Sequence, residues 1–322
     1  MDLLRRVRHV PRTLVLMTAI VMVFTAGGVA VGAGIGINLP NIITPVHEND
    51  ITNIDVLRME IKNYYGTPGA ATGSGATAGW TLPLASDSYY AKEAVRIANL
   101  GWGWLKQTAN KAIPMRAIVL DVDDTTLTTY NYELFSNWDY NPGTNAVFVG
   151  LNPTFTGNLF PATPGMVDLV YKAKGAGYAV FFITGRPDSQ HAATIANLVN
   201  DTAAGFSDVT TVTYSGATVP EFDAGFPMPT AQRIGHGGFA DGLFTKPSVG
   251  SYPAYLDKPA FCGPYIAQGK SCPTIQYKSG TRAYIESLGY EIVADFGDQF
   301  SDGLGGFKNK FFKMPNPSYY LP

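Results

Sequence analysis

Cysteine is scarce in this sequence, and basic residues do not outnumber acidic ones. The 322 residues include two cysteines, and 23 lysines and arginines stand against 25 aspartates and glutamates. Without a basic excess the chain lacks the charge pattern typical of nucleic-acid binding, so no nucleic acid polymer is expected as a partner. Charged residues make up 15% of the sequence and hydrophobic residues 46%, which is enough apolar sequence to bury a large core.

The apolar run near the N-terminus contains no cysteine, which excludes a lipid attached there. A basic stretch at 4–8 precedes this uncharged run at 13–39, and 31–33 supplies small residues at which a peptidase could cut. Residues 1–39 are therefore predicted to be a signal peptide or an N-terminal membrane anchor. The run is long for a signal and rich in glycine for a membrane helix, so both alternatives stay open. Either way we expect the body of the protein outside the cytoplasm, secreted or held at the membrane.

The two cysteines, Cys262 and Cys272, lie close together in the sequence. In an exported protein an even pair at short spacing favours a disulfide that closes a short loop over two free thiols.

The rest of the chain divides by composition and periodicity. Residues 40–85 are predicted to form an N-terminal helix at 51–65 followed by a flexible loop rich in glycine and alanine. Residues 86–322 are predicted to form the main domain, which contains a Gly-, Pro- and aromatic-rich insertion at 205–273. This insertion fits no clear helical periodicity and is a candidate lid or specificity element.

Within the main domain, apolar strands alternate with amphipathic helices. This alternation predicts an α/β fold, a central parallel sheet with helices on both faces. One helix is expected to start with Thr163 as its cap and Pro164 in its first turn, and another is expected to be capped by Asp188. His191 in the latter is interpreted as a packed residue and not a catalytic one. Strands are predicted at 117–120, 178–183 and 291–296, with an edge strand at 311–314.

Carboxylates follow the first of these strands directly. Asp121 and Asp123 can emerge on one side while Val122 points away, because side chains alternate along a strand. They could be solvated acids in a loop, or they could bind a cation or handle phosphate. An EF-hand is disfavoured, because its required glycine and carboxylate positions hold Thr126 and Tyr132.

Two further strands end in polar residues. The second is followed by Thr184 and the third by Asp298. Since ligands bind at the carboxyl ends of the strands in such sheets, we expect these side chains to converge with Asp121 and Asp123 at one edge.

Five motifs occur in order along the main domain. They are Asp121-Val122-Asp123-Asp124-Thr125, Thr184-Gly185-Arg186-Pro187, Tyr277-Lys278-Ser279-Gly280-Thr281-Arg282, Gly297-Asp298-Gln299-Phe300-Ser301-Asp302 and the tail Lys313–Tyr320. Taken in order, the first four resemble the motifs of the haloacid dehalogenase (HAD) superfamily. With the tail, the narrower resemblance is to its secreted acid phosphatase branch, which includes class B-like (subfamily IIIB) phosphatases and plant vegetative storage proteins. The resemblance implies a Rossmann-like HAD fold of three layers, α/β/α.

The resemblance implies two catalytic carboxylates and a metal site. Asp121 would be the nucleophile that forms an aspartyl-phosphate, and Asp123 the acid that protonates the leaving oxygen and then activates water. Mg²⁺ would be held by Asp121, the backbone carbonyl of Asp123 and Asp298. Asp302 would be a supporting residue that orients a metal-bound water or the lysine of the third motif.

The resemblance also implies a phosphate-binding set. Thr184 would donate its hydroxyl and Gly185 its backbone N–H to the phosphate oxygens, and Lys278 would add a positive charge near the start of a helix. Arg186 and Arg282 are interpreted as ion-pair partners of carboxylates in the wall of the site.

The function expected from this resemblance is an exported, magnesium-dependent acid phosphatase that hydrolyses small-molecule phosphate monoesters. Best activity is expected below neutral pH, because an aspartic acid donates a proton readily in acidic medium. Two alternatives remain. One is a non-catalytic extracellular storage or binding protein on the same fold, and the other is a phosphotransferase that uses the same intermediate.

Overall fold

The computed structural model of the chain describes residues 45–47, 50–66, 84–109, 111–113, 115–149, 160–199, 209–214, 217–222 and 242–321. The predicted signal or anchor at 1–39 and most of the glycine-rich loop after residue 66 lie outside the described residues. Among the helices that are described, none has the length and apolar character needed to cross a membrane.

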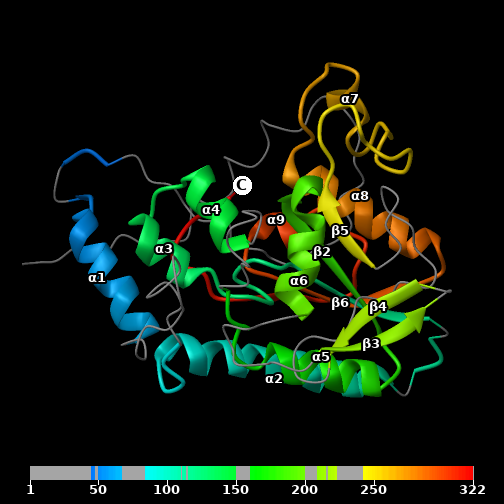
Figure 1. Ribbon diagram of the computed structural model, residues 1–322, viewed down its shortest axis with the longest axis horizontal. Helices are drawn as coiled ribbons and strands as arrows, with labels where there is room; N and C mark the ends of the chain where they lie inside the picture. Colours follow the sequence, from blue (N-terminus) through cyan, green and yellow to red (C-terminus); the bar gives the residue numbers. More distant parts are fainter. Residues whose placement is uncertain are drawn as a thin grey trace, which may run out of the picture. The chain divides into compact units, whose positions relative to one another are not determined.

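Five parallel strands form the central sheet of the described chain (Figure 1). They follow the order β5-β2-β1-β6-β7, and every neighbouring pair is parallel. The three predicted apolar strands are its centre, and the predicted edge strand near the tail is present as β7. The strands are β1 (Arg116–Leu120), β2 (Ala179–Pro187), β5 (Leu243–Lys246), β6 (Glu291–Gly297) and β7 (Phe311–Lys313).

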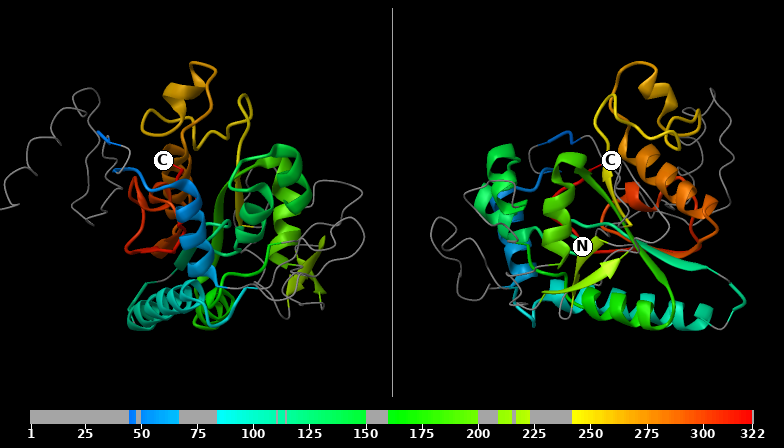
Figure 2. Two further views of the ribbon diagram at one scale, coloured as in Figure 1. Left: turned by 90° about the vertical axis from the view of Figure 1, so that its left-hand side faces the viewer. Right: turned by 45° about the vertical axis from the view of Figure 1, so that its right-hand side comes forward.

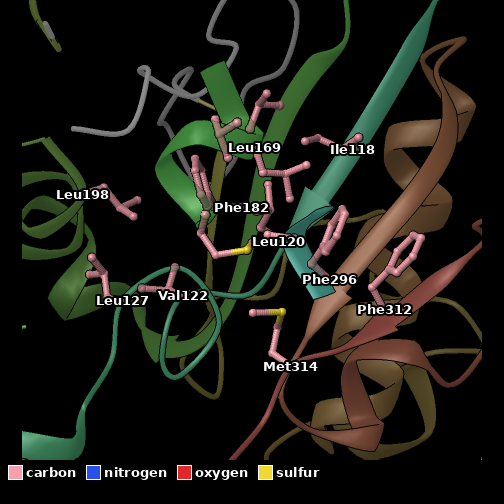
Figure 3. Close-up of a cluster of buried hydrophobic side chains, with 14 of the residues drawn as sticks. Ile118, Leu120, Val122, Leu127, Leu169, Phe182, Leu198, Phe296, Phe312 and Met314 are labelled. Carbon is pink, nitrogen blue, oxygen red and sulfur yellow. The ribbon is translucent and has the colours of Figure 1, made fainter. Parts of the chain in front are cut away.

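Alternate residues of the strands face opposite layers of helices. Ile118 and Leu120 belong to the hydrophobic cluster of Figure 3, which includes residues of α2 (Tyr89–Ala109) and α5 (Met166–Gly175). Ala117 and Val119 belong to a second cluster, which includes residues of α8 (Thr274–Ser287). Figure 2 shows α8 on the face of the sheet away from α2 and α5. The predicted three-layer α/β/α arrangement with a central parallel sheet is therefore confirmed.

The remaining elements surround this core. Helix α1 (Ile54–Tyr65) confirms the predicted N-terminal helix, and its Tyr65 ring stacks between Tyr90 of α2 and Tyr130 of α3, at centroid distances of 4.3 and 3.8 Å. The other elements are α3 (Tyr130–Ser136), α4 (Pro142–Val149), the 3₁₀ turn η3 (Asp188–Gln190), α6 (His191–Val199), the hairpin strands β3 (Val209–Tyr214) and β4 (Ala217–Phe222), α7 (Gly263–Ile266) and α9 (Phe300–Gly303).

Helix α5 starts later than the sequence predicted. Thr163 does not cap it and Pro164 does not lie in its first turn, because the first helical residue is Met166 and the N-cap is Gly165. Gly165 has a φ of +84°, and a Cβ there would lie 3.1 Å from the Cα of Val95 in α2. The close approach of the chain to α2 therefore favours a glycine at this position, and the helix begins only after it.

The prediction that Asp188 caps a helix was also wrong. A 3₁₀ turn intervenes, so α6 begins only at His191. Asp188 instead accepts a hydrogen bond from the hydroxyl of Thr245 in β5 (2.7 Å). His191 is buried, as predicted, and its Nδ1 lies 3.0 Å from Oγ1 of the same threonine.

The predicted insertion at 205–273 needs a correction in its second half. Residues Leu243–Lys246 are β5, which pairs with β2 and forms one edge of the central sheet. Leu243 and Phe244 are fully buried there. The strand has only four residues, so it is too short to show a periodicity against its Gly- and Pro-rich surroundings. The predicted short strands are represented by the β3–β4 hairpin, whereas residues 223–241 lie outside the described part.

The two cysteines form the predicted disulfide. Cys262 and Cys272 are both buried, and their Cα atoms lie 5.2 Å apart. The bridge joins the residue before α7 to the segment that leads into α8. It therefore ties the connection between β5 and α8 to the hydrophobic cluster beneath α8.

Candidate active site

The carboxyl ends of β1, β2 and β6 open into one cavity of about 500 Å³. Val122 is turned into the hydrophobic core (Figure 3), whereas Asp121 and Asp123 line the cavity, which is the alternation expected of a strand end. None of the described residues between 205 and 273 lines it, so the described part of that segment forms no wall of the site. Six residues of the predicted site line the cavity: Asp121, Asp123, Thr184, Gly185, Lys278 and Asp298.

The turn after β1 is held by hydrogen bonds of its own residues. Thr126 donates from its N–H to the carbonyl of Val122 (3.0 Å) and from its hydroxyl to that of Asp121 (2.5 Å). Asp124 accepts from the N–H (3.0 Å) and the hydroxyl (2.5 Å) of Thr129. Burial raises the pKa of Asp124 to about 6, although these hydrogen bonds oppose the rise. The turn is therefore fixed where it presents its two cavity-lining carboxylates.

Lys278 bridges two carboxylates at the base of the cavity. Its Nζ lies 2.8 Å from Oδ1 of Asp121 and forms an ion pair and hydrogen bond with Asp302. Burial alone would lower the pKa of Lys278, but the two carboxylates outweigh it and raise the pKa. For Asp121 burial dominates and raises the pKa, and Asp302 and Asp298 add to the rise, while Lys278 opposes it. The lysine is therefore a cation at neutral pH, and it lies beside the predicted nucleophile.

Three carboxylates form a candidate metal centre. Oxygens of Asp121, Asp298 and Asp302 all lie within 4.8 Å of one another, and the three residues are buried. Asp302, predicted only as a supporting residue, is thus close enough to contribute an oxygen. The carboxylate of Asp123 is not part of this group, and the contribution of its backbone carbonyl to a metal site stays a prediction.

Hydrogen bonds orient Asp298 within this group. Its Oδ2 accepts from Nδ2 of Asn316 (2.7 Å) and from Nε2 of Gln299 (2.6 Å), and the Thr125 hydroxyl lies 3.3 Å from its Oδ1. Burial, together with the charge of Asp302, raises the pKa of Asp298 to about 7.

Arg186 holds the carboxylate of Asp123. Its Nε donates to both carboxylate oxygens (3.2 and 2.9 Å) and its Nη2 donates to Oδ1 (2.6 Å). On its other side the guanidinium donates to Asn197 (2.9 Å) and Thr194 (3.3 Å) of α6. The predicted ion pair in the wall of the site is therefore present, and its carboxylate partner is Asp123.

Thr184 is placed to offer a hydrogen-bond donor to the cavity. Its Oγ1 accepts from the backbone N–H of Arg186 (3.1 Å), which leaves the hydroxyl proton available. Gly185 also lines the cavity, next to this hydroxyl. Together with the ammonium of Lys278, these groups form an arrangement suited to an anion.

The tail of the chain completes the site, which sequence reasoning missed. Besides the Asn316 contact, the Tyr319 hydroxyl forms a hydrogen bond with Asp124, and the N–H of Leu321 donates to Oε1 of Gln299 (3.0 Å). The signal that could have found these residues is the tail motif Lys313–Tyr320, to which no role was assigned. Glu133, which also lines the cavity, follows no recognised motif.

The buried carboxyls predict how stability depends on pH when metal is removed. The pKa of Asp124 is raised to about 6, and those of Asp295 and Asp298 to about 7, mainly by burial. Unfolded aspartates titrate near 4, so between about pH 4 and 7 the folded protein holds more protons, and raising the pH costs stability. We expect a higher melting temperature at pH 5 than at pH 7.5 in chelator at fixed ionic strength. A melting temperature that climbs steadily across this range would contradict the expectation.

Comparison with known proteins gives matches to acid phosphatases and storage proteins. The chain is 39% identical to Vegetative storage protein 2 of Arabidopsis thaliana over 54 residues, which are 17% of this chain and 20% of that protein. It is 26% identical to Acid phosphatase 1 of Solanum lycopersicum over 206 residues, 63% of this chain and 58% of that protein. The chain thus spans about a fifth of the first relative and somewhat more than half of the second.

A solved structure of a class C acid phosphatase from Bacillus anthracis is similar at 18% identity with a TM-score of 0.45, covering 73% of this chain and 80% of that chain. The family model of subfamily IIIB (acid phosphatase) of the HAD superfamily matches residues 90–218 and 264–322, more than half of the sequence. The matched residues include the turn after β1, the end of β2, Lys278, Asp298, Asp302 and the tail. The chain therefore belongs to subfamily IIIB, the acid phosphatase subfamily, of the HAD superfamily.

Proposed function

We propose that the protein is an exported, magnesium-dependent acid phosphatase that hydrolyses small-molecule phosphate monoesters through an aspartyl-phosphate on Asp121. The observation that carries this proposal is the 2.8 Å contact between Asp121 and Lys278 in a cavity that also presents Thr184 and Gly185. A nucleophilic carboxylate next to anion-binding groups is what phosphoryl transfer to an aspartate requires. Membership of the acid phosphatase subfamily supports the same reaction.

The carboxylate cluster fits a divalent metal. Asp121, Asp298 and Asp302 provide three carboxyl groups, and among the described cavity-lining cations only Lys278 contacts them. All three offer oxygen ligands, which Mg²⁺ prefers, and the backbone carbonyl of Asp123 would join them. When bound, the metal would supply positive charge against the phosphate and the carboxylates.

In the first step the carboxylate of Asp121 attacks phosphorus and the ester oxygen leaves. Two like charges about 4 Å apart near a protein surface repel by about 4 kcal/mol, so an unassisted carboxylate approaches a phosphate dianion poorly. The ammonium of Lys278 reduces this repulsion from its position next to Asp121. The hydroxyl of Thr184 and the N–H of Gly185 would donate to the non-bridging oxygens and orient the phosphate for in-line attack.

Asp123 would transfer the protons. It donates a proton to the leaving oxygen in the first step, and in the second it takes one from the water that attacks the aspartyl-phosphate. The hydrogen bonds from Arg186 fix the orientation of its carboxylate between the two steps. The need for a protonated aspartic acid in the first step is why we expect a pH optimum below neutral.

Phosphate release from p-nitrophenyl phosphate tests this proposal. We expect release that requires Mg²⁺, is abolished by chelator and restored by excess Mg²⁺, and is fastest below pH 7. Circular dichroism in chelator verifies that the protein stays folded while inactive. Release that is unaffected by chelator would contradict the metal requirement, and a rate that climbs steadily from acid to alkaline pH would contradict the role of Asp123.

A second candidate is a storage protein with little or no catalysis. It is favoured by the matches to proteins named as vegetative storage proteins. Wild-type protein that is folded, binds Mg²⁺ in calorimetry and yet releases no phosphate under any condition would support this candidate over the phosphatase.

A further inference from the structure

The cavity has a second part that the phosphate-binding groups do not account for. The phosphate end is defined by the strand ends and Lys278, whereas the remaining wall comes partly from Gln299 and the tail and partly from α3, α4 and the segment between them. The organic part of a bound phosphate ester would therefore meet these residues. They include Tyr132, Glu133, Trp138, Tyr140 and Asn145.

Glu133 is the charged residue of this second part. Its backbone is fixed in the first turn of α3, where its N–H donates to the carbonyl of Thr129 (3.1 Å) and its carbonyl accepts from Trp138 (2.9 Å). The residue is only 9% exposed, and it lines the cavity. The carboxyl group is thus held in the wall by a short, well-packed helix.

The carboxyl group of Glu133 has no partner of opposite charge. No hydrogen bond or ion pair joins it to another residue in the described part of the chain. The two cationic side chains among the described lining residues are already paired, Lys278 with Asp121 and Asp302, and Arg186 with Asp123. Burial, and then the charges of Asp124 and Asp123, raise the pKa of Glu133 to about 8, and a cation bound beside the carboxyl group would oppose this rise and favour its charged form.

The carboxyl oxygens of Glu133 are not among the fully buried, unpartnered side-chain atoms of the described residues, so they open into the cavity, where a bound group can reach them. The other carboxylates among the described residues of the cavity wall take part in the proposed reaction or in an ion pair. Glu133 does neither. A bound cation would give it the missing partner. The aromatic rings of Tyr132 and Tyr140 in the same wall are also favourable surroundings for a positive charge, whereas the ring of Trp138 already lies near Arg58 and Lys62.

We propose that Glu133 is a specificity-determining residue, which selects phosphate monoesters whose organic part carries an ammonium group. This inference rests on the proposed phosphatase function and adds a substrate class to it. The phosphate binds at the strand ends and the ammonium forms an ion pair with Glu133, so both ends of a zwitterionic ester are matched by the cavity.

The test compares two esters of the same size that differ in charge, O-phosphoethanolamine and propyl phosphate. With wild-type protein near neutral pH, we expect kcat/KM to be at least about tenfold higher for the ammonium ester. The Glu133→Gln variant keeps the shape of the side chain and removes its charge, so the ratio of the two kcat/KM values should fall by about tenfold. Glu60→Gln, at an exposed glutamate of α1, is the matched control and should leave the ratio unchanged.

A ratio near one in the wild type, or an equal ratio in Glu133→Gln, overturns the inference. The wild-type comparison needs no variant, so it decides the matter even if Glu133→Gln does not fold. Wild-type protein that cleaves p-nitrophenyl phosphate without preferring the ammonium ester overturns this inference alone. Protein that cleaves none of the three esters overturns the proposed function, and this inference with it.

Discussion

Replacing Asp121 by asparagine should lower kcat by about 10⁴-fold or more, because an amide cannot attack phosphorus and form the aspartyl-phosphate. The fold should survive this change. Asp121 lies within 4.8 Å of Asp298 and Asp302, so removing its charge relieves repulsion inside the cluster, and Lys278 keeps its ion pair with Asp302 when the pair with Asp121 is lost. We therefore expect Asp121→Asn to melt in chelator at a temperature equal to or above that of the wild type.

The covalent intermediate can be observed directly. Wild-type protein mixed with ³²P-labelled substrate and quenched in acid should retain label that hydroxylamine releases, and Asp121→Asn should retain none. Asp168→Asn is the control, because Asp168 is an exposed residue of α5 that pairs with Lys172 far from the site motifs in sequence. A folded Asp121→Asn protein with a rate within tenfold of the wild type would rule out Asp121 as the nucleophile.

Replacing Arg282 by methionine should destabilise the protein by about 3 to 5 kcal/mol, the range expected when one member of a buried ion pair is removed. Arg282 is 1% exposed, and its Nη1 lies 3.2 Å from Oδ2 of Asp295, which is also buried. The same guanidinium donates to the backbone carbonyls of Asp302, Leu304 and Gly306. Methionine would leave a buried carboxylate and three carbonyls without these donors.

Urea unfolding followed by circular dichroism measures this effect. Arg96→Met is the matched control, because Arg96 is exposed on α2 and its loss should change the unfolding free energy by less than about 0.5 kcal/mol. Adding Asp295→Asn to Arg282→Met should recover part of the loss, since it removes the stranded charge. Equal urea midpoints for Arg282→Met and the wild type would show that the buried pair contributes no net stability.

The centre of the fold was predictable because its strands are continuous apolar runs that end in polar residues. Asp121, Thr184 and Asp298 each follow such a run, and the rule that parallel strands present their carboxyl ends at one edge brings them together. Helix boundaries were less predictable. Gly165 marks the start of α5 through its close approach to Val95, which is a tertiary contact that no local pattern encodes.

Three residues of the site were not predicted from the sequence: Asn316, Tyr319 and Glu133. Asn316 and Tyr319 belong to a segment after the last strand, whose path back to the site is set by the packing of the tail and not by periodicity. Glu133 lies in a seven-residue helix whose orientation depends on its neighbours. Motif spacing locates residues that follow strands, whereas Asn316 and Tyr319 lie in irregular chain and Glu133 lies in a short helix outside the motifs.

The tail also determines when the site can exist during synthesis. In the candidate metal centre Asp298 lies close to Asp121 and accepts a hydrogen bond from Asn316. Asp121 and Asn316 are separated by most of the chain. While the tail is still inside the ribosome, the chain already contains the proposed nucleophile Asp121. It still lacks Asn316 and Tyr319, which form hydrogen bonds with Asp298 and Asp124. Such long-range closure comes late in folding, because distant segments must meet first. The site is therefore complete only after residues 316–319 have been translated and have packed against Asp298 and Asp124.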